Sequence, residues 1–235
     1  MAKRGNPSRK PGFKEEKFCA EQGFSLIAGI DEVGRGCLAG PVVASAVIMP
    51  LHRRFPWYKQ VRDSKFLTAE QREYLSPCIQ SSAIAVGSGA VEATVIDDIG
   101  MTAAVRLAMT TAIGKLLPQP DYALIDYLTI PDLALPHKGV EDGDTLCFSI
   151  ACASIVAKVF RDQLMTDMDE KYPGYHFANH KGYGTENHFM CLRERGPSPI
   201  HRYSFQPVRD IAQYSFDESG KPVLKPDTYG LCDGT

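Results

Sequence analysis

Residues 27–47, which read IAGIDEVGRGCLAGPVVASAV, decide the fold. An apolar run ends in two adjacent carboxylates, Asp31 and Glu32, and a glycine-rich segment then leads to a second apolar run over residues 42–49. Short apolar runs separated by glycine and proline are typical of β-strands joined by a turn. The sequence therefore predicts a strand, an acidic tip, a tight turn and a second strand, in that order.

The two adjacent acids allow two interpretations. Carboxylates at the edge of a core have a raised pKa and weaken the fold unless a positive charge lies beside them. Hard divalent cations such as Mg²⁺ and Mn²⁺ prefer oxygen ligands and would supply that charge. The alternative is an ordinary turn at a strand end with solvated acids. The local pattern favours the metal site.

The composition is that of a globular protein and excludes several classes. The chain has 235 residues, of which 44% are hydrophobic and 23% charged, and its formal net charge is −2. Nucleic-acid binding would therefore need a local basic patch. The seven cysteines form no CxxC pair and no zinc-ligand spacing, so reduced thiols in a cytoplasmic protein are expected. No apolar run is long enough to span a membrane.

The remaining pattern predicts an α/β fold with a mixed sheet. Thr68 and Gln71 form a capping box that opens a helix over residues 69–77. A third strand is expected at 83–91, where Gly87 and Gly89 indicate a bulge or close packing. The other elements expected are a helix at 102–117, a strand at 121–126, a loop at 127–144, a long helix at 145–171, a loop at 176–185 and a helix at 186–195.

Further acids follow the same pattern as the first pair. Asp126 ends the strand at 121–126, and Asp144 stands just before the predicted long helix, where its charge suits the helix N-terminus. If the two acid-tipped strands are neighbours in one sheet, their carboxylates lie side by side and repel one another. Two divalent ions would relieve that repulsion, and this arrangement is used for in-line attack on a phosphodiester.

Several blocks of the chain resemble the ribonuclease HII family, the bacterial type 2 ribonucleases H. The blocks appear in the family's order between about residues 24 and 205. They are GIDEVGRGCLAGPVVASAV at 29–47, DSKFL at 63–67, the strand ending at Asp126, Asp144 before SIACASIVAKVFRD at 149–162, and HKGYGTENH at 180–188.

The resemblance implies a ribonuclease H-like fold, with a mixed central sheet flanked by helices and a small helical C-terminal part. It implies a cytoplasmic endoribonuclease that cleaves RNA in RNA/DNA hybrids and cuts 5′ of single ribonucleotides in duplex DNA, in repair and replication. It also implies two divalent ions, Mn²⁺ or Mg²⁺. The family's metal-binding, catalytic acids match Asp31, Glu32, Asp126 and Asp144.

The resemblance also implies residues that recognise the substrate. In the family a Gly-Arg-Gly turn, here Gly34, Arg35 and Gly36, senses the 2′-hydroxyl, and a tyrosine matched by Tyr183 stacks near that sugar. Glycine allows a close backbone approach, and main-chain groups can bind a 2′-OH. Lys65, Lys181 and Arg35 are candidate phosphate contacts, which would position the duplex without reading its sequence.

Two departures from the family pattern concern the third and fourth acids. Asp126 is followed by Tyr127, where many members have Gly or Ala. Four residues, VEDG, separate the Lys138-Gly139 pair from Asp144, where many members have none. Glu141 and Asp142 are therefore alternatives to Asp144, which we favour because it keeps the spacing to the following helix.

The resemblance suggests three segments. Residues 1–20 are expected to form a flexible basic arm, more a solubilising tail than a nucleic-acid contact. Residues 21–205 would be the catalytic domain with its helical C-terminal region, and residues 206–235 an extended, partly ordered tail. No apolar seam indicates an obligate dimer, so a monomer is expected.

Several other side chains have both a structural and a functional interpretation. Asp162 more simply pairs with a neighbouring cation than takes part in catalysis. His180 and His188 are more often packing residues than proton shuttles, and Cys37 is expected to pack. Loop aromatics Trp57 and Tyr58 would either stack on bases or cover the core. The arginines are either a duplex-binding flank or a solvated face: Arg193, Arg195 and Arg202.

Two other functions share part of this pattern. A catalytically silent nucleic-acid binding module would gain nothing from four converging acids. A general phosphodiesterase or exonuclease would share the acids but would not need the Gly-Arg-Gly turn with Tyr183. We rank hydrolysis of RNA in RNA/DNA duplexes ahead of both.

Overall fold

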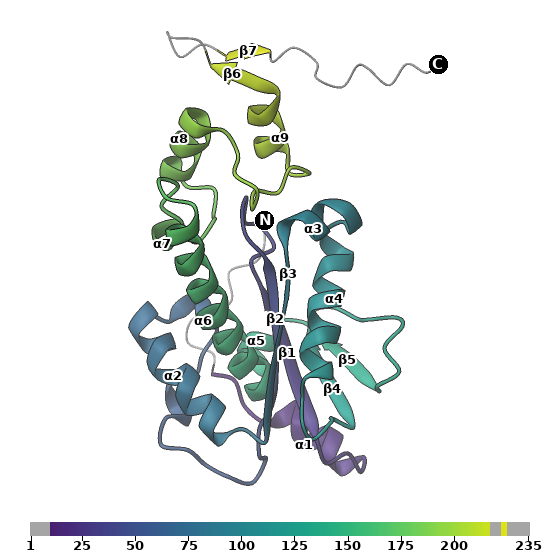
Figure 1. The fold of residues 1–235 in the computed structure, drawn as a ribbon. Helices are drawn as coiled ribbons and strands as arrows, with labels where there is room; N and C mark the ends of the chain where they lie inside the picture. Colours follow the sequence, from purple (N-terminus) through teal and green to yellow (C-terminus); the bar gives the residue numbers. More distant parts are fainter. Residues whose placement is uncertain (1–9, 217–221, 225–235) are drawn as a thin grey trace, which may run out of the picture.

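The protein is built on a five-stranded mixed sheet, seen in a computed structural model that describes residues 10–216 and 222–224. The strands are β1 Ile27–Val33, β2 Val42–Ile48, β3 Ala85–Val91, β4 Tyr122–Asp126 and β5 His137–Val140, in the order β3-β2-β1-β4-β5. β1, β2 and β3 are antiparallel neighbours, whereas β4 pairs parallel to β1, and β5 parallel to β4 (Figure 1). The predicted α/β class with a mixed central sheet is confirmed.

Helices cover both faces of this sheet (Figure 1). They are α1 Lys14–Glu21, α2 Ala69–Ser82, α3 Ala93–Ile99, α4 Met101–Gly114, α5 Gly143–Leu146, α6 Phe148–Lys171, α7 Phe177–His180, α8 Glu186–Arg195 and α9 Gln206–Gln213. Short 3-10 turns lie at Tyr58–Gln60 and Ser64–Phe66, and a small hairpin, β6 Tyr214–Phe216 with β7 Pro222–Leu224, follows α9. α2 and α6 pack on one face of the sheet and α3 and α4 on the other, while α7, α8 and α9 lie beyond one end. No described helix is long and apolar enough to cross a membrane.

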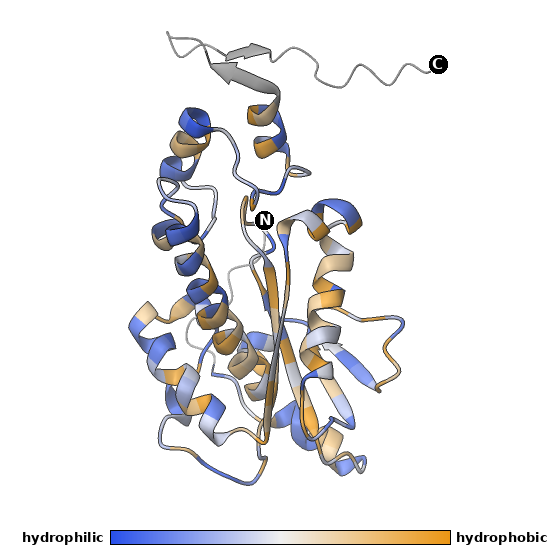
Figure 2. Ribbon diagram, viewed as in Figure 1, coloured by the Kyte–Doolittle hydropathy of each residue, from blue (hydrophilic) through white to orange (hydrophobic). Residues whose placement is uncertain are grey.

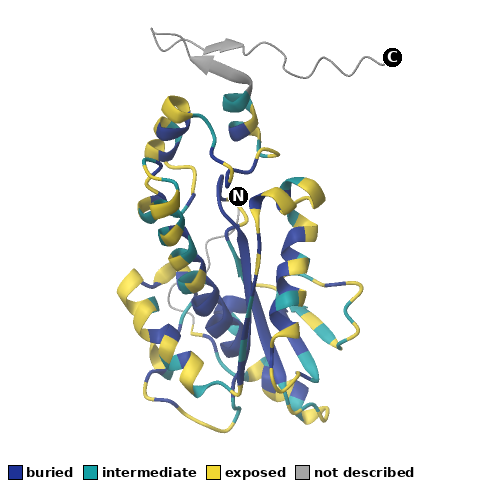
Figure 3. Cartoon of the chain, viewed as in Figure 1, coloured by how far each residue is buried: buried dark blue, intermediate teal, exposed yellow. Residues whose placement is uncertain are grey.

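The alternation of side chains along β1 assigns each residue to a face. Ala28 and Ile30 belong to the apolar cluster packed under α4, and Ile27 belongs to a cluster that includes Ile150 of α6. Since successive side chains point to opposite faces, Asp31 shares the α6 side with Ile27. The central strands β1 and β2 are mostly hydrophobic in Figure 2 and buried in Figure 3, whereas the edge strand β5 is more hydrophilic and less buried.

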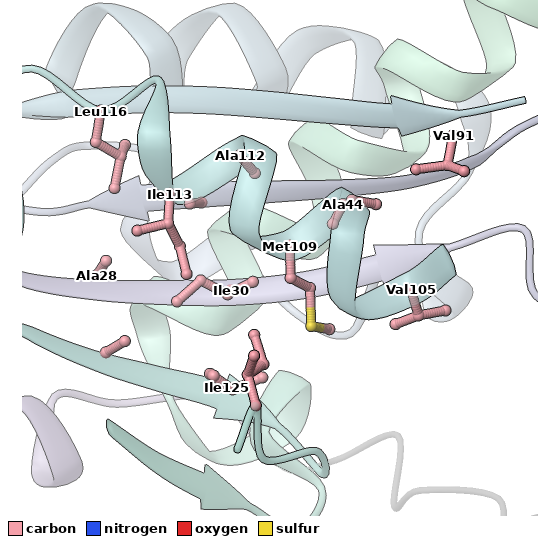
Figure 4. Packing of buried hydrophobic residues seen from close by; sticks show 14 of the residues in the cluster. Ala28, Ile30, Ala44, Val91, Val105, Met109, Ala112, Ile113, Leu116 and Ile125 are labelled. Atoms are coloured by element: carbon pink, nitrogen blue, oxygen red, sulfur yellow. The ribbon is translucent and has the colours of Figure 1, made fainter. Parts of the chain in front are cut away.

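The largest apolar cluster among the described residues lies under α4. Met109 and Ile113 of α4 contact the alanine-rich face of the sheet, which includes Ala28 and Ala44 (Figure 4). Each isoleucine or methionine side chain buried in this way contributes about 1.5–3 kcal/mol. The small sheet residues allow the helix to approach closely.

Glycines in the strands remove the side chains that would keep the helices away. A Cβ at Gly29 would overlap the backbone of Ser149 in α6. Gly87 and Gly89 of β3 likewise leave no room between their strand and the carbonyls of Ala112 and Ala108 in α4. Of the two predicted reasons for the β3 glycines, close packing is confirmed.

Several predicted element boundaries were wrong. The helix that begins with the Thr68–Gln71 capping box continues past Pro77 to Ser82. A proline inside a helix costs about 3 kcal/mol, but Leu75 and Ile79 on either side are buried, which retains the helix. The strand β5 lies inside the predicted loop 127–144, since its sequence HKGV is too short and polar to signal a strand.

The predicted helix 145–171 is two helices, and the predicted loop 176–185 contains a third. Cys147 has φ −108 and ψ 122, which is extended backbone, so it separates α5 from α6. α7 forms a single turn between His176 and Lys181, both of which have left-handed backbone angles. A turn this short has no apolar periodicity from which it could be recognised.

Both terminal segments contain helices where flexible or extended chain was expected. α1 lies within the predicted arm 1–20, and its Glu16 is buried and accepts hydrogen bonds of 2.8 Å from the Ser149 N–H and hydroxyl. α9 lies within the predicted extended tail, and its Val208 is buried in a cluster with Leu38 and Leu192. Residues 1–9, 217–221 and 225–235 lie outside the described part of the chain. The domain boundaries at residues 20 and 205 stay predictions.

Candidate active site

Two carboxylates lie side by side because two strands that end in acids are neighbours. β1 and β4 pair in parallel with Ile30 opposite Ile125, so Asp31 and Asp126 follow at the same edge of the sheet. Leu124 is in the cluster with Ile27 and Ile150, which places Asp126, two residues later, on the α6 side with Asp31. The sheet therefore brings these two predicted acids together.

The fourth predicted acid, Asp144, reaches the same place from α5. Asp144 is buried, and its Oδ2 lies 3.3 Å from the Nζ of Lys65. The preceding residue, Gly143, donates its N–H to Asp126 Oδ1 at 2.8 Å, which ties α5 to the end of β4. Asp144 was expected directly before the long helix, but it lies inside a separate short helix. Glu141 and Asp142, the alternatives considered from sequence, are both exposed.

Glu32 has one satisfied and one unsatisfied oxygen. Its Oε1 accepts a hydrogen bond of 3.1 Å from Arg35, whose side chain is 46% exposed. Its Oε2 is buried and has no hydrogen-bond partner among the described residues. A buried carboxylate oxygen without a partner costs free energy, so this atom is suited to an added cation or donor.

The acids disturb one another's ionisation. Burial raises the pKa of Asp126 to about 7, and the nearby charges of Asp144 and Glu32 add to the effect. Burial, followed by the charges of Glu32 and Asp126, also raises the pKa of Asp31 well above its usual range. The fold thus holds negative groups close together with too little positive charge to balance them.

The donor set fits a hard divalent cation. All four predicted ligands offer carboxylate oxygens, and one of these, Glu32 Oε2, is buried and unpaired. Burial raises the pKa values of all four acids, and the charges of neighbouring acids add to this for Asp31 and Asp126, so a positive ion between them would be bound favourably. Within the described residues, however, no three His, Cys, Asp or Glu side chains are arranged as a ready-made metal site. The fit therefore rests on donor chemistry and electrostatics.

The glycine turn after β1 is held from behind by a buried arginine. Gly34 has φ +93, a left-handed conformation that favours glycine, and a Cβ there would overlap the Arg161 side chain. Arg161 is fully buried and donates to the carbonyls of Pro41 at 2.9 Å, Lys181 at 2.9 Å and Ala39 at 3.2 Å. These bonds attach the segment that follows the turn, and the backbone at Lys181, to α6.

A second buried arginine holds the same turn from the C-terminal side. Arg202 donates to the Gly40 carbonyl through Nε and Nη2, at 3.0 and 2.9 Å, and to the Arg35 carbonyl at 2.9 Å. Arg202 was predicted to belong to a duplex-binding flank or to a solvated face. Both predictions were wrong, because Arg202 is fully buried. Arg193 and Arg195 are exposed. The positions of the two buried arginines had no signal in the sequence beyond the motifs that contain them.

Tyr183 lies at the cleft that contains the acids. A hollow of about 290 Å³ is lined by Asp31, Glu32, Lys65 and Tyr183, among others. The Tyr183 ring is 38% exposed, and the Lys158 ammonium lies 5.4 Å from its centroid. Burial and the neighbouring Cys37 raise the pKa of Tyr183 to about 12, so its hydroxyl stays protonated. The ring is available for stacking at the edge of the acidic cleft.

Three buried histidines connect Tyr183 to the C-terminal region. His201 Nδ1 accepts from the Ser198 N–H at 2.8 Å, so its Nε2 carries the proton and donates to His188 Nε2 at 3.0 Å. His188 must then donate from Nδ1 to the Tyr183 carbonyl, 2.9 Å away. His180 stacks on His188 with centroids 4.2 Å apart. The three neutral rings are packing residues that position the Tyr183 backbone.

The remaining predicted residues take other positions. Lys181 lies in an adjacent hollow of about 580 Å³ and donates to the Thr166 hydroxyl at 2.7 Å, so it does not reach the acids. Asp162 pairs with Lys158 at 2.6 Å, as its structural interpretation predicted. Trp57 is buried against Phe55, whereas Tyr58 is half-buried, so Trp57 covers the core. Cys37 is fully buried, and the six described cysteines are all reduced.

Comparison with known proteins gives the same family over most of the chain. Residues 28–208 match the profile of the family described as ribonuclease HII. A ribonuclease HII of Dehalococcoides mccartyi is 57% identical over 201 residues, which is 86% of this chain and 95% of the relative. A ribonuclease HII of Geobacter metallireducens is 47% identical over 195 residues, covering 83% of this chain and 90% of the relative.

Solved structures show the same fold at lower identity. The ribonuclease H2 of Pyrococcus horikoshii matches with a TM-score of 0.67 and 22% identity, covering 80% of this chain and 97% of that one. The ribonuclease HII of Archaeoglobus fulgidus, solved in a complex with PCNA, matches with a TM-score of 0.66 and 24% identity, covering 82% and 99%. With the acid-tipped strands and the match over residues 28–208, this chain belongs to the ribonuclease HII family, endonucleases that hydrolyse RNA in RNA/DNA hybrids.

Proposed function

We propose that the protein also cuts duplex DNA on the 5′ side of a single embedded ribonucleotide, and that it does so with two divalent cations, Mn²⁺ or Mg²⁺. The observation that supports this proposal is a hollow lined by Asp31, Glu32 and Tyr183. Asp126 and Asp144 lie near enough to these acids to interact with their charges, and the glycine turn follows Glu32 by two residues in the chain. The family depends on divalent metal, and a solved relative, a ribonuclease HIII, was obtained in complex with Mn²⁺.

Four acids are the proposed ligands. Asp31 and Asp126 would contribute from adjacent strand ends, Glu32 through its unpaired Oε2, and Asp144 from α5. Divalent cations held there would activate a water molecule and offset the charge that develops on the leaving oxygen. Lys65, whose side chain is mostly exposed and ends beside Asp144, is proposed to contact a phosphate next to the scissile bond.

Selection for RNA is assigned to the glycine turn and Tyr183. The backbone of Gly34, Arg35 and Gly36 is proposed to bind the 2′-hydroxyl, a group that acts as both donor and acceptor. The turn is suited to this because Arg202 holds its Arg35 carbonyl, and because Arg161 and Arg202 hold the carbonyls of residues 39–41, which follow the turn. Tyr183 would stack against the sugar or the adjacent base. Arg35 and Lys181 are proposed as further backbone contacts.

The direct test uses a DNA duplex that carries one ribonucleotide, with Mn²⁺ or Mg²⁺ added. We expect cleavage on the 5′ side of the ribonucleotide, and none in the same duplex with a deoxyribonucleotide at that position. The Asp31→Asn variant should lose this cleavage, whereas the matched control Asp98→Asn, whose exposed carboxylate in α3 does not line the acidic hollow, should retain it. An unchanged rate in Asp31→Asn would reject the metal role. Cleavage of the all-DNA duplex would indicate a general phosphodiesterase.

A further inference from the structure

The loop between β2 and α2 forms a groove whose charged lining is entirely positive. The groove has a volume of about 750 Å³, and its charged side chains are Lys17 of α1 and Arg53, Arg54 and Lys59 of the loop. His52 also lines it, and no Asp or Glu does. In a chain with a formal net charge of −2, four cations in one hollow are a marked local excess. Such a hollow attracts an anion.

These cations are not neutralised by the part of the chain that the structure describes. The ion pairs formed there join Arg35, Lys65, Lys138 and Lys158 to acids, and none involves a groove residue. Residues 1–9, which precede α1, carry three basic and no acidic side chains. They therefore cannot supply a partner carboxylate. Within residues 10–216 and 222–224, the groove cations therefore form no ion pair.

Packed aromatic rings form a rigid support below the cations. Phe55 is buried and stacks on Trp57 with centroids 4.9 Å apart, and the Arg53 guanidinium lies 5.5 Å from the Phe55 ring. Tyr58 stacks on Phe13, 5.9 Å away, at the side of the groove. Because these rings are fixed by the core, the loop presents its cations on a preformed surface.

An apolar hollow continues from the groove. It has a volume of about 620 Å³, shares Leu51, His52 and Arg53 with the groove, and is also lined by Phe24 and Ile84. Ile84 is a large hydrophobic residue that is 42% exposed. A positive groove beside an exposed apolar hollow is suited to single-stranded nucleic acid, whose phosphates would contact the cations and whose unstacked bases would lie against apolar residues such as Ile84.

The groove is separate from the acidic cleft. Ser45 of β2 lies opposite Asp31, and Ile48 lies opposite Ala28, so β2 runs away from the acids for three residues, or roughly 10 Å, before the loop begins. The first part of the loop therefore lies beyond the other end of the strands, at the bottom of the view in Figure 1, whereas the last part returns to the acidic cleft at Lys65. Many residues of the first part are exposed and yellow in Figure 3.

We propose that this groove is a second nucleic-acid site, which binds a single strand away from the position of cleavage. A duplex would use the cations alone, because its bases are stacked inside and cannot reach the apolar hollow. A single strand would use both parts of the surface. This binding is independent of the proposed cleavage, since it needs neither a ribonucleotide nor a divalent ion.

The test measures binding of a fluorescent 20-nucleotide single-stranded DNA without ribonucleotides to the full chain, in EDTA and over a range of salt. The groove variant is Arg53→Ala with Arg54→Ala. The matched control is Lys115→Ala with Lys171→Ala, which removes the same charge from exposed positions outside both hollows. Thermal melting of both variants checks folding, and cleavage of a short ribonucleotide-containing duplex checks the catalytic site.

We expect the groove variant to bind the single strand at least fivefold more weakly, with the salt slope reduced by about 1.4, or about 0.7 for each lost phosphate contact. The control variant should change less than twofold. An equal loss in both variants, or none in the groove variant, would overturn the proposal. So would a loss of duplex binding as large as that of single-strand binding. Loss of binding to an acidic peptide, with DNA binding unchanged, would instead make the groove a protein interface.

Discussion

The acidic end of the sheet and the turn beside it use buried charge in opposite ways. At the sheet end, negative groups are held together, and burial with mutual repulsion raises the pKa values of Asp31 and Asp126. In the adjacent turn, Arg161 and Arg202 are buried without a carboxylate, and each makes three hydrogen bonds to backbone carbonyls. The acids at the sheet end lack positive charge to balance them, whereas the two arginines have hydrogen-bond acceptors within the protein.

This difference distinguishes the acids, which would bind cations, from the arginines, which hold the backbone beside the acids in place. An incomplete charge cluster lowers the stability of the fold and gains free energy when cations bind. A satisfied buried cation gains nothing from a ligand but fixes the backbone around it. Removing a charge should therefore have opposite effects on stability in the two regions.

The largest expected effect is on the acidic side of this comparison. Asp31→Asn should lower the cleavage rate of a ribonucleotide-containing duplex by at least about 10³-fold, because a metal ligand is lost. The same change removes one of several repelling charges, so without divalent ions the free energy of unfolding should rise by about 1–2 kcal/mol. Chemical denaturation in EDTA measures this. A large loss of stability would mean that the acids do not repel one another in the folded protein.

The opposite result is expected for the buried arginine. Arg161→Met leaves the carbonyls of Ala39, Pro41 and Lys181 without their donor, so the free energy of unfolding should fall by about 3 kcal/mol or more. Arg161→Lys, which keeps the charge but only part of the hydrogen-bond geometry, should recover some of the loss. Denaturation with urea compares the three proteins. If Arg161→Met were as stable as the parent, the turn would not depend on these bonds.

A smaller effect is expected from acid at the histidines behind Tyr183. Burial lowers the pKa of His188 to about 4 and that of His201 to about 3, and it also lowers the pKa of His180. Because the folded pKa lies below the unfolded value near 6.5, the stabilisation is complete above pH 6.5 and is lost as the pH falls toward 4. Over this interval the loss should be about 1.4 kcal/mol per pH unit for each histidine that takes up a proton only on unfolding.

The control for this prediction is the variant His201→Gln. An amide can keep a hydrogen bond to His188 but does not titrate in this range, so the decline between pH 6.5 and 4 should become shallower. Denaturation midpoints at several pH values give the comparison. An identical pH profile in the parent and the variant would assign the acid sensitivity to other groups.

The sequence predicted the sheet and the acids better than it predicted their support. Strand ends with carboxylates, and the spacing of the family blocks, were enough to bring Asp31 and Asp126 to one edge, because apolar runs and acids are local signals. The burial of Arg161 and Arg202 is not local. Their partners are carbonyls that lie 20 to 167 positions away in the chain, and any residue type can supply a carbonyl. The extended residue Cys147 between α5 and α6 could not be predicted either, because the apolar periodicity of a helix continues across it.

The smallest expected effect on stability distinguishes two glycines of the same turn. Gly34 has a positive φ, and a Cβ there would overlap Arg161, whereas a Cβ at Gly36 would meet nothing within 4 Å. Gly34→Ala should therefore lower the free energy of unfolding by about 1–3 kcal/mol, and Gly36→Ala should leave it unchanged. Discrimination between a ribonucleotide and a deoxyribonucleotide should weaken in both variants if the turn contacts the 2′-hydroxyl. Because Gly36→Ala changes no internal contact, a loss of discrimination there would report the sugar contact itself, and normal discrimination there would move the sensor away from Gly36.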